Sequence, residues 1–148
     1  MYKDALRAAW AEINITNLDF NIKQIKEKVG SGVKITGVVK ADAYGHGSVR
    51  VATVLRANGI ESFAVATLSE AVRLRKAGFL LEEIMVLSPI PEPYIDTIIE
   101  HRLSPVVCDY KNAEAISKAA AAAGIIIKGY IAVDTGMGRI GYSDDVTS

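Results

Sequence analysis

The sequence predicts an α/β fold in which parallel strands alternate with helices along the chain. Short apolar segments typical of strands begin near Ile35, Phe63, Ile84, Pro105 and Ile126, and a helical pattern fills each gap between them. The last four of these starts are evenly spaced, 21 residues apart. Regular alternation of this kind is typical of βα units. Because the strand segments are apolar at successive residues, we expect a sheet that is covered on both faces.

The N-terminal segment stands outside this alternation. Residues 10–15 alternate in polarity, so we expect a half-exposed strand there. Apolar residues at helical spacing then run from Leu18 to Val29, and Asn17 is placed to cap that helix. The segment therefore predicts one strand and one helix before the first βα unit.

Several later helices carry start and stop signals. Thr67 and Glu70 form a capping-box pair ahead of an apolar run. Glycines stand where C-terminal caps are expected, at Gly59, Gly78 and Gly124. Pro91 and Pro93 open the next helix, at a position where proline is tolerated, and an alanine-rich helix covers residues 115–123.

Composition excludes some classes of function. Lys and Arg together number 17, as do Asp and Glu, so there is no electrostatic reason to expect a nucleic-acid or membrane partner. Cys108 is the only cysteine, which excludes an intrachain disulfide and suits a cytoplasmic protein. We expect no signal peptide, and the longest apolar run, 119–127, is about half the length of a membrane span.

Residues 38–47, Val-Val-Lys-Ala-Asp-Ala-Tyr-Gly-His-Gly, are the most informative segment. An apolar strand leads directly into Lys40, and a turn built from Asp42 and two glycines precedes the next helix. An ammonium at the end of a buried strand is costly unless water or a partner solvates it. A partly desolvated lysine is useful chemically, because a neutral amine attacks a carbonyl to form a Schiff base.

A second polar segment, Asp134-Thr135-Gly136-Met137-Gly138-Arg139-Ile140-Gly141, follows the fifth predicted strand, which covers residues 126–133. Parallel strands of a βα barrel present their C-terminal ends at one rim, where barrel enzymes build their active sites. We therefore expect Lys40 and Arg139 to lie at the same rim.

Both segments resemble those of bacterial alanine racemases, fold type III pyridoxal-phosphate enzymes whose first barrel strand ends in Lys-Ala-Asp-Ala-Tyr-Gly-His-Gly. The resemblance covers residues 10–139 and implies a homodimeric isomerase that interconverts L- and D-alanine for peptidoglycan synthesis. A closed eight-stranded barrel needs roughly 250 residues, whereas five βα units use up this chain. We interpret residues 18–148 as a partial TIM-type barrel that binds the cofactor. Residues 1–17 are interpreted as a strand that would pair with an absent C-terminal β domain, and we expect the fragment alone to be inactive.

The resemblance also implies roles for three residues. Lys40 would hold pyridoxal 5'-phosphate as a Schiff base and exchange a proton at the substrate Cα. Tyr44 would contact the cofactor phosphate. Arg139 would contact the phenolic oxygen of the cofactor and the carboxylate of alanine, a task suited to a planar group with several donors. The competing interpretations are a solvated lysine, a tyrosine packed on the rim and an arginine that caps strand-end carbonyls.

Other polar residues of the two segments favour structural roles. His46 is expected to be a turn or helix-start residue, Asp42 to fix the turn through backbone hydrogen bonds, and Asp134 to be structural as well. Cys108 is expected to be a small core residue. No metal site is predicted.

Ala132 departs from the family pattern. Many alanine racemases carry at this position a lysine whose carbamylated side chain orients the arginine. Arg139 would therefore need another partner, such as chloride or a different side chain. The base on the opposite face of the substrate and the arginine that pairs with the pyridine nitrogen would both come from chain beyond Ser148.

Two alternative functions stay open. One is a pyridoxal-phosphate racemase of another amino acid, such as serine or lysine. The other is a non-catalytic pyridoxal-phosphate-binding barrel protein, although those proteins lack the two segments together.

Overall fold

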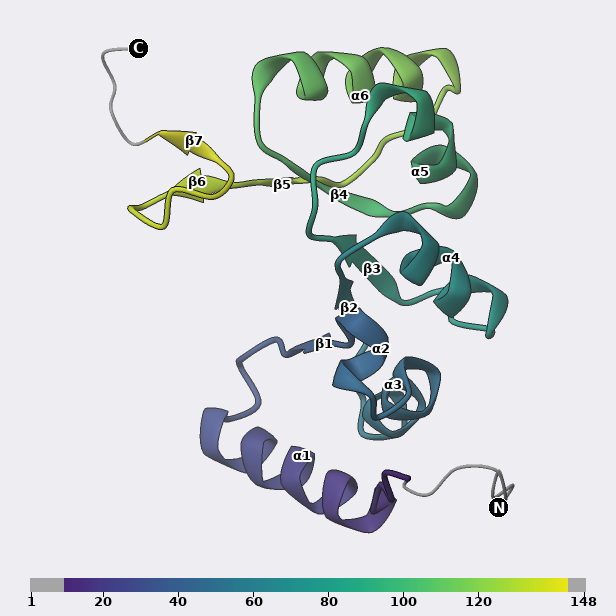
Figure 1. Ribbon diagram of the computed structural model, residues 1–148, viewed down its shortest axis with the longest axis vertical. Coiled ribbons are helices and arrows are strands. Elements are labelled where there is room, and N and C mark those ends of the chain that lie inside the picture. The colour runs from purple at the N-terminus through teal and green to yellow at the C-terminus, as the bar shows by residue number, and fades with distance from the viewer. Residues whose placement is uncertain (1–9, 144–148) are drawn as a thin grey trace.

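The computed structural model describes residues 10–143 as a curved parallel sheet with helices packed along it (Figure 1). In the first half of the chain the elements are α1 (Ile15–Val29), β1 (Thr36–Val38), α2 (Lys40–Tyr44), α3 (Ser48–Ala57), β2 (Ser62–Val65), α4 (Leu68–Lys76) and β3 (Glu83–Val86). In the second half they are the 3-10 helix η1 (Glu92–Tyr94), α5 (Ile95–His101), β4 (Ser104–Val107), α6 (Tyr110–Ala122), β5 (Tyr130–Ile131), β6 (Val133–Asp134) and β7 (Tyr142–Ser143).

The main sheet has the strand order β1-β2-β3-β4-β5, and every neighbouring pair is parallel. Phe63 of β2 lies opposite Gly37 of β1 on one side and Ile84 of β3 on the other. Sequential order with helical crossovers is the arrangement of consecutive βα units. The predicted α/β class and the parallel sheet are thus confirmed.

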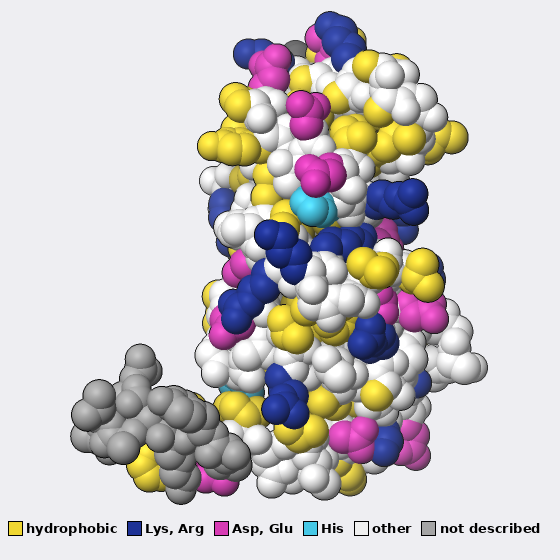
Figure 2. Space-filling view, turned by 90° about the vertical axis from the view of Figure 1, so that its right-hand side faces the viewer, with side chains coloured by type: hydrophobic (Ala, Val, Ile, Leu, Met, Phe, Trp, Pro, Cys, Tyr) yellow, Lys and Arg dark blue, Asp and Glu magenta, His cyan; other side chains and the backbone are white. Residues whose placement is uncertain are grey.

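The core lies between the sheet and helices α3 to α6, which cover one face (Figure 1). Phe63, Phe79, Leu74 and Ile84 are fully buried there, and the Phe63 and Phe79 rings meet edge to face with centroids 5.4 Å apart. The outer surface of this layer carries acidic and basic side chains interspersed among apolar ones (Figure 2). Mixed charge of this kind is typical of a solvated surface.

The opposite face of the sheet is more open than predicted. Val38 of β1 is 52% exposed, and Met85 of β3 is only half-buried. A barrel covers its inner face only when further strands complete the ring. The expectation of cover on both faces is therefore wrong for residues 10–143, which supply only part of such a ring.

The helix signals are confirmed where hydrogen bonds can be traced. The Thr67 and Glu70 side chains and backbones form the full capping box at the start of α4. Gly59 and Gly78 follow α3 and α4 with φ of 76° and 92°, the left-handed region that favours glycine at a C-terminal cap.

The start of α1 differs from the sequence prediction. Its N-cap is Asn14, whose side chain accepts a hydrogen bond from the Asn17 backbone N–H at 3.0 Å, so Asn17 lies inside the first turn. The helix thus begins at Ile15, and residues 10–14 belong to neither a helix nor a strand. The predicted strand at 10–15 is not formed within the described part of the chain, because Ile15 already belongs to α1 and residues 10–14 are part of neither sheet. Residues 1–9 lie outside the described residues, and pairing with a second domain stays a prediction.

The fifth strand is also shorter than predicted. Residues 126–129 lie outside the sheet, and Ile126 is 99% exposed. β5 pairs with β4 for two residues only, and the chain then forms the small β6–β7 pair. Pairing within the sheet therefore covers only the middle of the predicted strand.

A buried arginine ties the middle of the fold together. Arg75 of α4 is 9% exposed, and its guanidinium donates to four backbone carbonyls, those of Phe79, Glu82, His101 and Arg102, at 2.5–2.9 Å. These carbonyls belong to the loop before β3 and to the end of α5. One side chain therefore fixes α4 against the following βα unit.

We expect Arg75→Met to lower the free energy of unfolding by roughly 3 kcal/mol, because buried carbonyls lose their donors. Urea unfolding followed by circular dichroism measures the loss. Lys76→Met, one residue further on the exposed side of α4, is the matched control and should leave the midpoint nearly unchanged. Equal midpoints for the two variants would contradict this role of Arg75.

Candidate active site

Lys40 stands at the C-terminal edge of the sheet, two residues after the end of β1. The backbone just before Lys40 is still paired with β2, because the Val39 N–H donates a hydrogen bond to the Ala64 carbonyl at 2.9 Å. Lys40 is half-buried, and its amine makes no hydrogen bond or ion pair with residues 10–143. The amine is thus placed at the rim without a competing protein partner.

The turn after Lys40 is wound left-handed. Ala41, Asp42 and Ala43 have φ/ψ of 51°/45°, 52°/42° and 53°/43°, and Tyr44 has φ of 51°. This region costs about 1–2 kcal/mol for a residue with a Cβ, and only Asn and Asp visit it readily besides glycine. Four consecutive residues therefore need strong support from their surroundings. We call residues 41–44 the left-handed turn.

Backbone hydrogen bonds close the left-handed turn. The Ala43 N–H donates to the Val39 carbonyl at 3.0 Å, and the Gly45 and Gly47 N–H groups donate to the Asp42 carbonyl at 3.2 and 2.9 Å. Ala43 itself is 8% exposed and packs within the core. The turn is consequently held by hydrogen bonds at both of its ends and by the packing of Ala43 in the core.

Asp42 joins the left-handed turn to α3. Its Oδ1 accepts from the Ser48 N–H at 2.8 Å and from the Ser48 hydroxyl at 3.0 Å. The Arg73 guanidinium lies 3.4 Å from the same oxygen. The Ser48 backbone bond, then the hydroxyl bond, and to a lesser degree Arg73 lower the pKa of the Asp42 carboxyl from its usual value. The predicted role of Asp42 in fixing the turn is confirmed.

Tyr44 and His46 occupy the outer end of the same segment. Tyr44 is 71% exposed, and its hydroxyl has no hydrogen-bond partner among the described residues. The His46 Nδ1 lies 3.0 Å from the Ala43 carbonyl oxygen, as expected for a turn residue. The structure therefore brings Lys40 and Tyr44 together on one turn.

Arg139 lies in the loop between β6 and β7 and is exposed. Asp134 shapes this loop, because its Oδ1 accepts from the Gly138 and Gly136 N–H groups at 3.0 and 2.9 Å. These two bonds, that from Gly138 first, lower the pKa of the Asp134 carboxyl. The structural role predicted for Asp134 is confirmed.

Lys40 and Arg139 follow strands at opposite edges of the sheet. β1 and β5 are four positions apart, and at about 4.8 Å for each step they are separated by roughly 19 Å along the sheet. Both residues follow the carboxyl ends of parallel strands, but residues 10–143 do not bring them into contact. Curvature of a completed barrel would shorten this separation.

Ala132 follows β5 directly. Its N–H donates to the Val107 carbonyl and its carbonyl accepts from the Tyr142 N–H, each at 2.9 Å. The half-buried methyl group thus stands between the main sheet and the β6–β7 pair. A methyl group has no donor or acceptor with which to orient Arg139.

Glu70 is the rim residue whose full role sequence reasoning missed. Besides its capping-box bonds, the carboxylate accepts a hydrogen bond from the Ala41 N–H, with 2.6 Å between nitrogen and Oε1. The Thr-x-x-Glu signal identified the cap, but Ala41 is 29 residues earlier in the chain. Only the side-by-side placement of β1 and β2 could reveal this bond.

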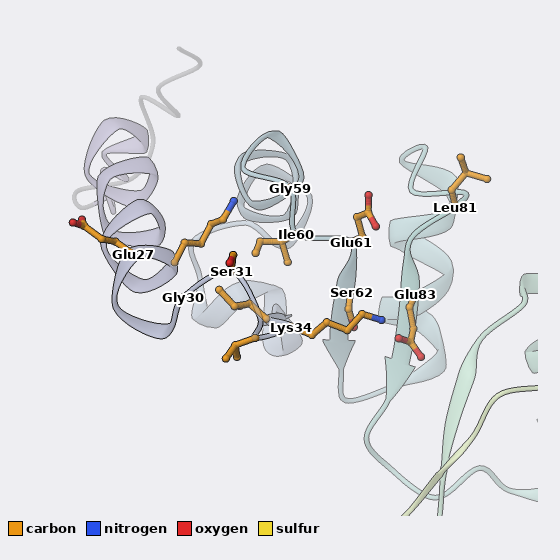
Figure 3. Close-up of a pocket in the computed structure, with 13 residues that line it drawn as sticks. Glu27, Gly30, Ser31, Lys34, Gly59, Ile60, Glu61, Ser62, Leu81 and Glu83 are labelled. Atoms are coloured by element: carbon orange, nitrogen blue, oxygen red, sulfur yellow. The ribbon is translucent and has the colours of Figure 1, made fainter.

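A hollow of about 700 Å³ lies at the opposite end of the strands (Figure 3). It is lined by the end of α1 and the starts of β1 to β3, and Lys34 extends across it toward Glu83. Active sites of βα barrels lie at the other rim. We therefore assign the candidate site to the Lys40 rim and not to this hollow.

Two other kinds of site are absent from residues 10–143. No group of three or more His, Cys, Asp or Glu side chains there could hold a metal ion. None of the helices in that part of the chain has the length and apolar character needed to cross a membrane.

Comparison with known proteins gives a consistent result. The family described as "Alanine racemase, N-terminal domain" matches residues 13–147. The alanine racemase of Clostridium kluyveri is 49% identical over 142 residues, which are 96% of this chain and 36% of that protein. The solved alanine racemase of Clostridium difficile 630 in complex with cycloserine matches with a TM-score of 0.88 and 36% identity, over 95% of this chain and 38% of that one.

The same fold occurs in a racemase of different specificity. Histidine racemase from Leuconostoc mesenteroides matches with a TM-score of 0.77 and 29% identity, over 87% of this chain and 34% of that one. The chain spans little more than a third of the length of the relatives that it matches. These solved structures confirm the prediction that the five strands and their helices are part of a βα barrel.

We expect Asp42→Ala to lower the free energy of unfolding by about 1 kcal/mol, the usual effect of losing a side-chain cap. Asp42→Asn keeps an oxygen for Ser48 and tolerates the left-handed region, so its loss should be smaller. Chemical unfolding of both variants and of the unchanged chain measures this order.

The pH dependence gives a second readout. Because the folded-state pKa of Asp42 lies below its unfolded value, the stability that ionised Asp42 adds is complete above about pH 4. It is lost as the pH falls through the folded-state pKa. The unchanged chain should therefore lose its advantage over Asp42→Asn on acidification, and an advantage that grows at low pH would contradict the assignment.

Proposed function

Because the chain belongs to the alanine racemase N-terminal domain family, we propose that it forms the first βα units of a pyridoxal-phosphate-dependent alanine racemase. The observation that carries this proposal is the Lys40 amine, which follows the C-terminal end of a parallel strand and has no partner among residues 10–143. The enzyme would interconvert L- and D-alanine and so supply D-alanine for peptidoglycan in the cytoplasm.

The donors present fit the cofactor. Pyridoxal phosphate offers an aldehyde, a phenolic oxygen and a phosphate. A primary amine suits the aldehyde, and a phenol hydroxyl and a guanidinium suit the two kinds of oxygen acceptor. Lys40 and Tyr44 stand on one turn, and the Tyr44 hydroxyl is not committed to another described residue.

We assign the residues as follows. Lys40 would hold the cofactor, and Tyr44 would donate a hydrogen bond to its phosphate. Arg139 would bind the substrate carboxylate and the phenolic oxygen once the barrel brings it to the Lys40 side of the rim. When bound, the cofactor supplies a sink for the negative charge that develops at the substrate Cα.

In the proposed reaction the Lys40 amine moves a proton to and from Cα on one face of the substrate. Racemisation also requires a proton donor and acceptor on the opposite face. Lys40 reaches one face only, so we propose that the second group comes from the rest of the polypeptide or from the partner subunit of a homodimer. The chain alone is then expected to be inactive.

A racemase of another amino acid is the second candidate function. The observation that favours it is the likeness to a histidine racemase over 87% of this chain. Ala132 also removes the lysine that orients the arginine in many alanine racemases, so substrate binding here would depend on other groups. Serine and lysine are further substrates to test, and a non-catalytic pyridoxal-phosphate carrier is the alternative without turnover.

We expect the complete protein to form an imine with pyridoxal phosphate on Lys40, because its amine follows the carboxyl end of β1 and has no partner among residues 10–143. Borohydride should abolish the imine absorbance band and fix the cofactor, and peptide mapping should find the adduct on Lys40. Lys34→Ala and Lys128→Ala are matched controls that should keep the band, whereas Lys40→Ala should remove it.

An adduct on Lys34 or Lys128 would overturn the cofactor assignment. Racemisation assays of the same protein with L-alanine, L-serine, L-lysine and L-histidine then identify the substrate. Alanine should have the highest kcat/KM, and a preference for another amino acid would favour the second candidate function.

A further inference from the structure

The Glu70 carboxylate joins two strand ends at the rim. Its Oε2 accepts from the Ala66 and Thr67 N–H groups at 2.7 and 3.1 Å, where β2 gives way to α4. Its Oε1 accepts from the Ala41 N–H at 2.6 Å, in the left-handed turn that follows β1. One half-buried side chain therefore satisfies three backbone donors from two successive βα units.

The Ala41 bond bears directly on Lys40. The Ala41 nitrogen and the Lys40 carbonyl carbon share one planar peptide group, so an acceptor that fixes the N–H direction also fixes the plane on the C-terminal side of Lys40. The plane on its N-terminal side contains the Val39 carbonyl, which accepts a hydrogen bond from the Ala43 N–H at 3.0 Å. Together the two bonds limit the directions in which the Lys40 side chain leaves the backbone.

A second side chain of α4 reaches the same turn. Arg73 lies three residues after Glu70, on the same face of the helix, and its guanidinium is 3.4 Å from the Asp42 carboxylate. Glu70 and Arg73 thus contact consecutive residues of the left-handed turn. Because the Arg73–Asp42 pair is exposed, we expect it to contribute less than the shorter Glu70 bond.

We propose that Glu70 is a positioning residue of the active site, which holds the left-handed turn through Ala41 and so aims the Lys40 amine. This inference rests on the proposed function for its catalytic consequence. Its structural part, the dependence of the turn on Glu70, stands independently. Glu70 does not act on the substrate itself.

The competing explanation is that Glu70 only caps α4. The chemistry of the side chain separates the two roles. A carboxylate has two accepting oxygens, whereas glutamine has one accepting oxygen and one donating NH₂ group. In Glu70→Gln the oxygen can cap Ala66 and Thr67, but the NH₂ group would then face the Ala41 N–H, donor against donor. Glu70→Gln therefore removes the Ala41 bond and keeps the cap.

Thr67→Ala is the converse variant. The Thr67 hydroxyl accepts from the Glu70 N–H at 3.4 Å and completes the capping box, but it makes no bond to the left-handed turn. This variant weakens the cap and leaves the Ala41 bond in place. A loss caused by α4 alone should appear in Thr67→Ala as well, whereas a loss caused by the turn should not.

The first measurement is hydrogen–deuterium exchange of the complete protein without cofactor. We expect Glu70→Gln to speed exchange of the peptide that contains Ala41 by about tenfold, as one local hydrogen bond is lost. Thr67→Ala should leave that peptide unchanged and affect the start of α4. Equal exchange at Ala41 in Glu70→Gln and the unchanged protein would overturn the structural part.

The second measurement follows imine formation by absorbance after pyridoxal phosphate is added to the apoprotein. Glu70→Gln should slow imine formation by about tenfold. It should also lower kcat more than it raises KM, because the amine is less often oriented toward the reacting atom after the substrate has bound. Thr67→Ala should match the unchanged protein. Equal rates in all three proteins would overturn the positioning of Lys40.

Failure of the proposed function has a different signature. If the unchanged protein forms no imine on Lys40, the proposed function is wrong, while the exchange comparison still decides whether Glu70 holds the turn. If Glu70→Gln does not fold, Arg73→Gln replaces it, since this variant leaves the cap intact and loses only the contact to Asp42. Arg73→Gln should then increase exchange of the same peptide by a smaller factor. An unchanged exchange rate would contradict the proposal that side chains of α4 hold the left-handed turn.

Discussion

The conformation that the site depends on is the left-handed turn after Lys40. Four successive residues with side chains adopt positive φ there, at a cost of about 1–2 kcal/mol for each of them except Asp42. The turn connects β1, which ends at Val38, to α3, which begins at Ser48. The amine and Tyr44 are thereby displayed on one short segment at the edge of the sheet. An extended path would separate them.

The surrounding fold supplies what the turn lacks locally. The Asp42 carboxylate accepts a hydrogen bond from Ser48, and Ala43 is buried in the core. Glu70, from the neighbouring βα unit, accepts a hydrogen bond from the Ala41 N–H. Arg75, five residues after Glu70 on α4, anchors that helix to the next unit through carbonyl groups that precede β3 and β4. The left-handed turn is therefore held by side chains and backbone of two consecutive βα units.

Local signals in the sequence predicted much of this arrangement. The evenly spaced apolar runs predicted the parallel sheet, and Thr67 with Glu70 predicted the cap of α4. The handedness of the turn was not predictable, because two alanines and a tyrosine carry no preference for positive φ. The Glu70–Ala41 bond was missed for a different reason, since it joins residues far apart in the chain. Lengths of edge elements such as β5 depend on neighbouring strands, and a local pattern cannot supply that information.

The left-handed turn, held to Glu70 through Ala41, is the conformation on which this interpretation depends. A crystal structure of the complete apoprotein, at a resolution that defines peptide planes, tests it most directly. We predict φ near 50° from Ala41 to Tyr44, with the Ala41 nitrogen within hydrogen-bonding distance of Glu70. A right-handed or disordered segment 41–44 that becomes left-handed only with pyridoxal phosphate bound would contradict the claim.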